Sequence, residues 1–412
     1  MSAPIETPRF TVTPQMQRLP IVGIVIGVAA LALGLATDTE RAARNLLICG
    51  FYAVSVGVIG MFFISTQRLS SAKWSATIRR IPEALTRVLP AGIVILAVVA
   101  VVFHQIYPWA GHDPAWMKIK DGIKLENGLT VHAGREVYLA PTFVYARMIG
   151  CFVLWLAFTI WFRKTSADAD ASKQAGLTAH RKLNRIAGTF AVLFAFSFTA
   201  VAFDFIVSLT PDWFTTMYAV FVFAGSFALG IAVIALTLIL LIKHGAFGPG
   251  AKAIGGEPLH TLGTMLLAFS TFWAYIWTCQ YLLIWYGNIP EEVTFYMPRS
   301  NSTWLWLFLG NVFINWIIPF FTLLPRTSKR SLKIMQAICT LVIIGHWLDI
   351  YLLVMPSKYE NALPLGPIEI GMAIGVIGLI SLIIMRGLSR LPLVPTHDPV
   401  IEYRRSLAAH GH

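Results

Sequence analysis

A histidine and an aspartate stand three residues apart in the apolar stretch GHWLDIYLLVMP, residues 345–356. Residues at this spacing share one face of a helix, so His346 and Asp349 would lie one turn apart. A carboxylate beside an imidazole can orient the ring or exchange a proton with it near neutral pH. The pattern favours proton transfer, and the alternative is a structural pair that holds helices together.

Four further ionisable side chains fall within or at the ends of apolar segments: Arg147, Asp204, His104 and Glu369. A charge at the centre of a membrane span costs about 2.5–3.5 kcal/mol, so such residues are usually paired or functional. We predict a proton-handling role for Asp204, with structural pairing as the alternative. Arg147 is counted with Asp204, His346 and Asp349 as a proton-handling candidate, and its side chain either extends to the membrane surface or neutralises a buried acid. His104 and Glu369 lie near helix ends and are interpreted as interfacial residues.

The composition predicts an integral membrane protein. Of the 412 residues, 57% are hydrophobic and 13% are charged, the mean hydropathy is +0.69, and soluble domains carry about 25% charged residues. Apolar runs without two-residue alternation favour helices over a β-barrel. Ten candidate spans cover about 20–36, 47–66, 87–106, 141–162, 186–208, 214–242, 260–287, 303–324, 332–355 and 366–388.

Lysine and arginine residues of the connections are concentrated on one side of these spans, among them Arg79 and Arg80, and fewer fall on the other side, among them Arg41, Arg44 and Arg299. This asymmetry predicts both termini in the cytoplasm. The expected organisation is a cytoplasmic segment 1–19, a membrane domain 20–388 and a cytoplasmic tail 389–412. Basic cytoplasmic loops account for the net charge of +12. Nucleic acid is therefore not an expected partner, and membrane lipid is.

A weak internal repeat relates the two aspartates. The fifth span ends AFDFIVSLTP and the ninth ends WLDIYLLVMP, so each aspartate stands seven residues before a proline. An offset of four spans preserves direction across the membrane, which predicts parallel units at about 47–208 and 214–355. The expected fold is all-α, with two four-helix bundles and two peripheral helices. Val201 stands where the second unit has His346.

The chain lacks the sequence signatures of its own redox cofactors. No CxxC, CxxCH or ferredoxin-type spacing occurs, and Cys49, Cys151, Cys279 and Cys339 all fall within predicted spans. The motifs of phosphate-binding loops, serine hydrolases and zinc proteases are also missing. We therefore expect no covalently bound cofactor, no metal site and no catalytic residue of a soluble-enzyme type.

Three long aromatic-rich strings together resemble the F subunit of alternative complex III, a bacterial quinol:cytochrome c oxidoreductase. They are DWFTTMYAVFVFAGSFALG (212–230), FWAYIWTCQYLLIWYGNIPEE (272–292) and GHWLDIYLLVMP. The resemblance implies an NrfD-like, polysulfide-reductase-type anchor in the bacterial inner membrane that assembles with a homologous ten-helix C subunit. It also implies periplasmic partner subunits that carry haem c and iron–sulfur clusters. Menaquinol or ubiquinol would be oxidised near the outer face, chiefly on the C subunit.

Four aromatic residues are candidates for a quinone groove: Trp273, Trp277, Tyr281 and Tyr286. Packing between helices, or an interfacial belt, is the more common role for such residues. The connection 107–140 carries an Asn127-Gly128 turn signal, and it either docks an extrinsic partner or caps the bundle.

Two other classes of protein stay open. A proton-coupled secondary transporter would use the same buried acids near the membrane midplane, between broken helices. A b-type cytochrome would need two facing histidines, for which His104 and His346 are the available pair.

Overall fold

Helices dominate the chain, and ten of those in the described residues are long and apolar enough to cross a membrane. The prediction of an all-α membrane protein with ten spans is confirmed. The computed structural model describes residues 10–110, 123–124, 130–131, 134–171, 177–211, 213–247 and 251–394. The elements are α1 (Pro14–Thr37), α2 (Thr39–Leu69), α3 (Arg80–Leu85), α4 (Leu89–Val101), α5 (Phe103–Ile106), β1 (Ile123–Lys124), β2 (Thr130–Val131), α7 (Gly134–Tyr138), α8 (Pro141–Ala171), α9 (Leu177–Phe205), α10 (Tyr218–Lys243), α11 (Ala251–Gly287), α12 (Pro290–Val293), α13 (Met297–Ser300), α14 (Leu305–Val312), α15 (Ile318–Leu323), α16 (Leu332–Val354) and α17 (Pro367–Leu388).

The first two helices begin earlier than their apolar runs. The side chain of Thr13 caps α1, and Asp38 Oδ1 accepts from the backbone N–H of Arg41 at 3.0 Å at the start of α2. The predicted spans began at 20 and 47 because hydropathy identifies the apolar part of a helix and not the polar residues that cap it. Arg41 and Arg44, which the sequence places in a loop, therefore lie in the first turns of α2.

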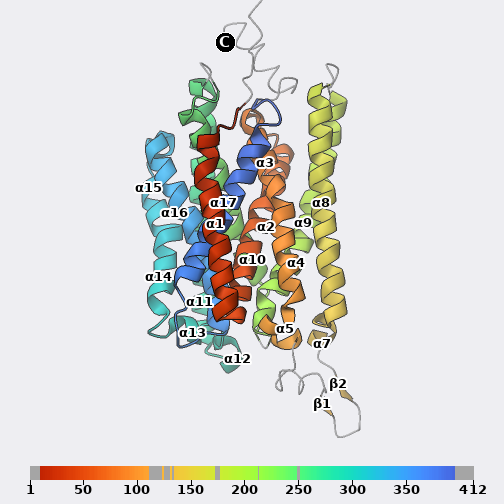
Figure 1. Ribbon diagram of the computed structural model, residues 1–412, viewed down its shortest axis with the longest axis vertical. Coiled ribbons are helices and arrows are strands. Elements are labelled where there is room, and N and C mark those ends of the chain that lie inside the picture. Colours follow the sequence, from red (N-terminus) through yellow and green to blue (C-terminus); the bar gives the residue numbers. More distant parts are fainter. Residues whose placement is uncertain are drawn as a thin grey trace, which may run out of the picture.

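The helices stand side by side, with two distinct ends (Figure 1). We call the end where α1 begins and α17 ends the terminal face, and the end that carries α5, α7, α12 and α13 the loop face. At the loop face, β1 pairs antiparallel with β2, with Ile123 opposite Val131 and Lys124 opposite Thr130. Asn127 and Gly128, the predicted turn, lie outside the described residues.

Contacts divide the helices into two groups of four and one pair. In the first helix group, α2 packs on α4 and α9, and α9 packs on α8. In the second helix group, α10 packs on α11 and α16, and the segment α14–α15 contacts both α11 and α16. The pair α1 and α17 lies against α2 and α3. These groups match the residues of the two predicted repeat units, and their evolutionary relation stays a prediction.

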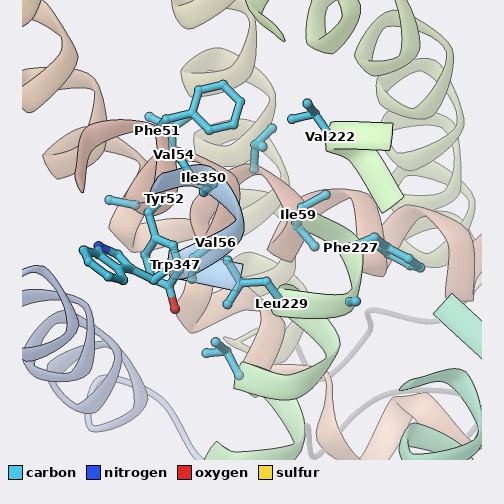
Figure 2. Close-up of a cluster of buried hydrophobic side chains, with 14 of the residues drawn as sticks. Phe51, Tyr52, Val54, Val56, Ile59, Val222, Phe227, Leu229, Trp347 and Ile350 are labelled. Carbon is cyan, nitrogen blue, oxygen red and sulfur yellow. The ribbon is translucent and has the colours of Figure 1, made fainter. Parts of the chain in front are cut away.

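The core lies where the two groups meet. Figure 2 shows buried side chains from three helices in contact there, and they come from α2 (Phe51, Tyr52, Val54, Val56, Ile59), α10 (Val222, Phe227, Leu229) and α16 (Trp347, Ile350). Apolar packing at the meeting point of both groups makes a rigid frame for the polar groups closer to the loop face.

The α1–α17 pair is held by close backbone contact. A Cβ on Gly27 would lie 2.5 Å from the Cα of Gly375, so a larger side chain at either position would push the helices apart. Small residues that let backbones approach are typical of helix pairs in membranes.

Candidate functional site

Asp349 is buried on α16 and accepts two hydrogen bonds from other helices. Asn311 Nδ2 on α14 donates to Asp349 Oδ1 at 2.7 Å, and Trp273 Nε1 on α11 donates to Asp349 Oδ2 at 3.1 Å. Only 5% of Asp349 is exposed. Both donors are uncharged, so these two contacts fix the carboxylate in place without neutralising it.

A second asparagine extends this hydrogen-bonded chain along the eighth span. Asn315 Nδ2 donates to Asn311 Oδ1 at 2.6 Å, and both residues are fully buried. Asn315 lies in a π-helical turn, Phe313–Ile317, that interrupts the helix between α14 and α15. Pro319 lacks the N–H that would donate to the carbonyl of Asn315, which accounts for the local change in helix pitch. Turns of this kind are often found at functional sites.

His346 lies beside Asp349 but does not hydrogen-bond to it. Its Nδ1 is 3.8 Å from Asp349 Oδ2, beyond direct hydrogen-bond distance. The residue is 2% exposed, and neither ring nitrogen has a hydrogen-bond partner in the described part of the chain. Its ring stands edge-on to Trp273, with centroids 5.9 Å apart. The sequence correctly predicted the shared helical face, and the proton exchange stays a prediction.

A small cavity of about 20 Å³ adjoins Asp349 on its loop-face side. It is lined by Asn311, Gln280 and Arg299 among others, and its volume is enough for about one water. Gln280 is 7% exposed, and its Nε2 has no partner among the described residues. Buried waters in proteins normally hydrogen-bond to polar groups of this kind, here an unpaired amide donor next to a carboxylate.

Arg299, on α13, closes the other side of this cavity. It is 2% exposed, and it donates to the backbone carbonyls of Phe295, Leu352 and Leu353 at 2.5, 2.9 and 3.0 Å. Burial lowers the pKa of Arg299 to about 10, so the guanidinium stays charged at neutral pH. Backbone carbonyl oxygens accept from three of its N–H groups, and Arg299 and Asp349 both line the cavity.

The other buried aspartate has a different partner. Arg147 on α8 forms two hydrogen bonds to Asp204 on α9, Nε to Oδ2 at 2.9 Å and Nη2 to Oδ1 at 2.5 Å. The guanidinium also lies 3.8 Å from the ring centroid of Tyr138. Of the two sequence interpretations of Arg147, the structure therefore shows the neutralising one. A two-point ion pair of this kind favours a structural role for Asp204.

The two acids nevertheless occupy corresponding places. Asp204 is on the fifth span and accepts from Arg147 on the fourth, whereas Asp349 is on the ninth and accepts from Asn311 on the eighth. An offset of four spans relates both acids and both donors. The second helix group thus holds an amide where the first holds a cation.

Glu369 is not an interfacial residue, as the sequence suggested, because its side chain is fully buried. It accepts from Arg41 at 2.7 and 2.6 Å, from Asn45 at 2.9 Å and from the backbone N–H of Gly366. This network ties the start of α17 to the start of α2. His104 is exposed on α5, as an interfacial residue would be, and so its surroundings differ from those of buried His346.

Arg44, also on α2, joins three segments at the loop face. It is 4% exposed, and it donates to Ser357 Oγ at 2.9 Å, to the carbonyl of Ile106 at 3.2 Å and to Glu40 at 3.0 Å. The loop-face cations Arg44 and Arg299 are therefore internal braces and not loop charges.

A second cluster of buried charges lies near the terminal face. Arg80, on α3, pairs with Glu83 and Asp170, and Glu83 accepts from Ser166 Oγ at 2.7 Å. The sequence counted Arg79 and Arg80 as loop cations, whereas both are buried. Arg79 and Arg80 both face Glu83 and Asp170, which is typical of a structural network joining α3 to α8.

The four aromatic candidates for a quinone groove do not share one cavity in the described structure. Trp273 is fully buried at Asp349, and Trp277 lines the small cavity and stacks on Tyr281 with centroids 5.7 Å apart. Tyr286 is 87% exposed. A cavity of about 20 Å³ holds a water and not a quinone ring.

Sequence reasoning missed several residues of this site: Asn311, Asn315, Gln280, Arg299 and Gly225. Asn311 and Asn315 carried a usable signal, because amides four residues apart in an apolar span lie on one helical face. Gly225 carried none. A Cβ there would lie 3.2 Å from His346 Nδ1 and 3.3 Å from Asp349 Oδ2, so glycine leaves the space that the pair occupies.

Fold and site together define a multi-pass helical membrane protein with one buried, cation-paired acid and one buried acid held by neutral donors. The chain matches no protein-family model and no curated protein sequence.

Proposed function

We propose that this chain is the membrane subunit of a quinol:electron-acceptor oxidoreductase of the alternative complex III type, and that Asp349 and His346 handle protons in it. The motif resemblance described above supplies the class of complex. The single structural observation that supports the proton role is that Asp349 is buried with amide and indole donors, while its counterpart Asp204 carries an arginine.

An acid without a cation at its oxygens can change protonation state at lower cost than one locked in an ion pair. His346 lies near enough for direct transfer, because its Nδ1 is 3.8 Å from Asp349 Oδ2 and a shift of less than about 1 Å would bring the two atoms within hydrogen-bond distance. The cavity toward Gln280 offers a second step in the direction of the loop face. The pair and the cavity therefore form the beginning of a proton path, which we place on the periplasmic side.

Quinol oxidation releases two protons and two electrons. The cavity at Asp349 does not fit a quinone ring, so quinol binding is assigned to the homologous C subunit, and the electrons pass to iron–sulfur and haem c subunits. This chain would contribute proton conduction and the frame for assembly in the bacterial inner membrane.

The test compares Asp349→Asn with Asp204→Asn in the purified complex, after subunit and haem content are checked. We expect Asp349→Asn to assemble and to lower quinol-dependent cytochrome reduction by about a hundredfold, the usual loss for a proton-transfer group. Asp349→Glu, which keeps an acid, should retain part of the activity. Asp204→Asn should weaken assembly and leave the number of protons released per turnover unchanged.

Full turnover with normal proton release in Asp349→Asn would refute the proton role. Recovery of the chain as a stable, transport-active homo-oligomer without redox partners would instead favour the secondary transporter.

A further inference from the structure

An apolar cavity lies between the α1–α17 pair and the two helix groups. It has a volume of about 390 Å³ and is lined by side chains of α1, α2, α10, α16 and α17, among them Val56, Leu236 and Ile380. The cavity is partly open to the outside of the bundle, and its lining residues Leu19 and Leu240 are exposed, so an acyl chain of the surrounding membrane can enter it. Tyr52 and Val56, at its deep end, also belong to the core cluster shown in Figure 2.

The cavity is about as long as the hydrocarbon layer of one membrane leaflet. Along α17 its lining runs from Ile377 to Leu388, and along α10 from Val233 to His244. Eleven residues of helix rise about 16 Å, which is about half of the 30 Å hydrocarbon thickness of a bilayer. The cavity therefore extends from the middle of the bundle to the terminal face, where α1 begins and α17 ends (Figure 1).

Its deep end is mostly apolar. The hydroxyl of Tyr52 donates to the carbonyl of Ile343 at 2.8 Å, and that of Thr237 donates to Val233 at 2.7 Å, so both are engaged with backbone. Ser381 of α17 is a third hydroxyl on the lining, and the other residues around it are largely hydrocarbon side chains, which suit an acyl chain better than the polar ring of a quinone.

The mouth of the cavity has a different chemistry. His244 lines it at the terminal face and is exposed, and the neighbouring Lys243 pairs with Gln336 of α16. On the other side, Arg386 of α17 donates to Gln17 of α1 at 3.4 Å. Lys243 and Arg386 do not line the cavity themselves, but they directly adjoin the lining residues His244 and Met385 in the sequence. Both are exposed cations that donate to the amide oxygens of Gln336 and Gln17, which carry no charge, so each can still attract an anionic headgroup.

We propose that this cavity binds an anionic phospholipid, with one acyl chain between α17 and α10 and the phosphate near Lys243, His244 and Arg386. The lipid seals the junction between the α1–α17 pair and the rest of the protein. The site is independent of Asp349 and of the proposed redox role.

The experiment uses the protein or complex as extracted in mild detergent. Delipidated protein is titrated in parallel with phosphatidylglycerol, phosphatidylcholine and inorganic phosphate, and native mass spectrometry counts the bound molecules. We expect one phosphatidylglycerol to bind per chain, phosphatidylcholine to bind more weakly, and phosphate alone not to bind. A phosphatidylglycerol with a photoreactive acyl chain should label peptides of α10 and α17.

Two variants test the charge and the cavity separately. Lys243→Gln with Arg386→Gln should weaken phosphatidylglycerol binding by about tenfold or more. The matched control is Arg330→Gln with Lys333→Gln, two exposed cations at the same face, and it should bind as the parent does. Leu236→Trp should abolish labelling of α10 by the acyl chain, because the indole fills the cavity.

Equal binding by the charge variant and its control would overturn the proposal. So would labelling of α10 and α17 that survives in Leu236→Trp, or a copurifying isoprenoid quinone that competes with phosphatidylglycerol for the cavity. Because Lys243 and Arg386 are exposed, the charge variant stays informative if Leu236→Trp does not fold.

Discussion

Asn311 holds the carboxylate of Asp349 at 2.7 Å, in the place where the first helix group uses Arg147 to hold Asp204. If the two groups are repeats, as predicted, they differ in the charge of the donor at one position. An arginine makes its acid a structural ion pair, whereas an amide donates a hydrogen bond without a compensating charge. This difference directs the mutational tests toward the second group for chemistry and toward the first for stability.

The ion pair of the first group should behave as a structural unit. Arg147→Leu leaves Asp204 buried and uncompensated, which should cost about 3–5 kcal/mol. The double variant Arg147→Leu with Asp204→Leu should recover most of that loss, because no unpaired charge remains. Thermal unfolding of all three proteins in detergent measures the coupling. Additive losses in the double variant would show that the two side chains do not stabilise each other.

Asn311 should be needed to position Asp349. Asn311→Leu removes the donor to Asp349 Oδ1 and the acceptor of Asn315 Nδ2. Each buried polar group left without a partner costs about 1–3 kcal/mol. We expect a lower unfolding temperature together with a shifted pH dependence of quinol-dependent turnover. An unchanged pH profile would mean that Asn311 braces the helix and does not position the acid.

Gly225 offers a test that changes no charge. Alanine at 225 would bring a Cβ to 3.2 Å from both His346 Nδ1 and Trp273 Cδ1, so Gly225→Ala should displace the pair and lower activity. Gly150→Ala on α8 is the matched control, because its Cβ meets nothing within 4 Å. That control should be neutral or stabilising by about 0.5–1 kcal/mol. Activity and unfolding temperature are measured for both, and parent-like activity in Gly225→Ala would argue against a tightly built site.

The orientation in the membrane can be tested at two exposed threonines. Thr294 lies between α12 and α13 at the loop face, and Thr327 lies between α15 and α16 at the terminal face. In a background without the half-buried Cys151 and Cys279, a membrane-impermeant maleimide applied to intact cells should label Thr294→Cys and not Thr327→Cys. The reverse pattern would invert the topology and place Asp349 near the cytoplasm.

Hydropathy and composition were enough to predict ten helices and an all-α membrane fold. A membrane-spanning segment must be one continuous apolar run, and a helix satisfies the backbone hydrogen bonds of such a run internally. The same pattern singled out His346 and Asp349, since ionisable groups are rare in such runs. Helix ends were less accurate: Asp38 caps α2 nine residues before its predicted start at 47, because a cap depends on local hydrogen bonds and not on hydropathy.

The partners of each polar group were decided by tertiary structure alone. Asp204 and Asp349 look equivalent in sequence, each seven residues before a proline, and they differ because Arg147 and Asn311 come to them from other helices. The burial of Arg299 and Glu369 could not be predicted from the sequence either, since a residue near the end of an apolar run can face solvent or a neighbouring helix. Hydropathy reports the preference of a segment for lipid, whereas the role of a buried charge depends on which side chains lie within about 3 Å of it.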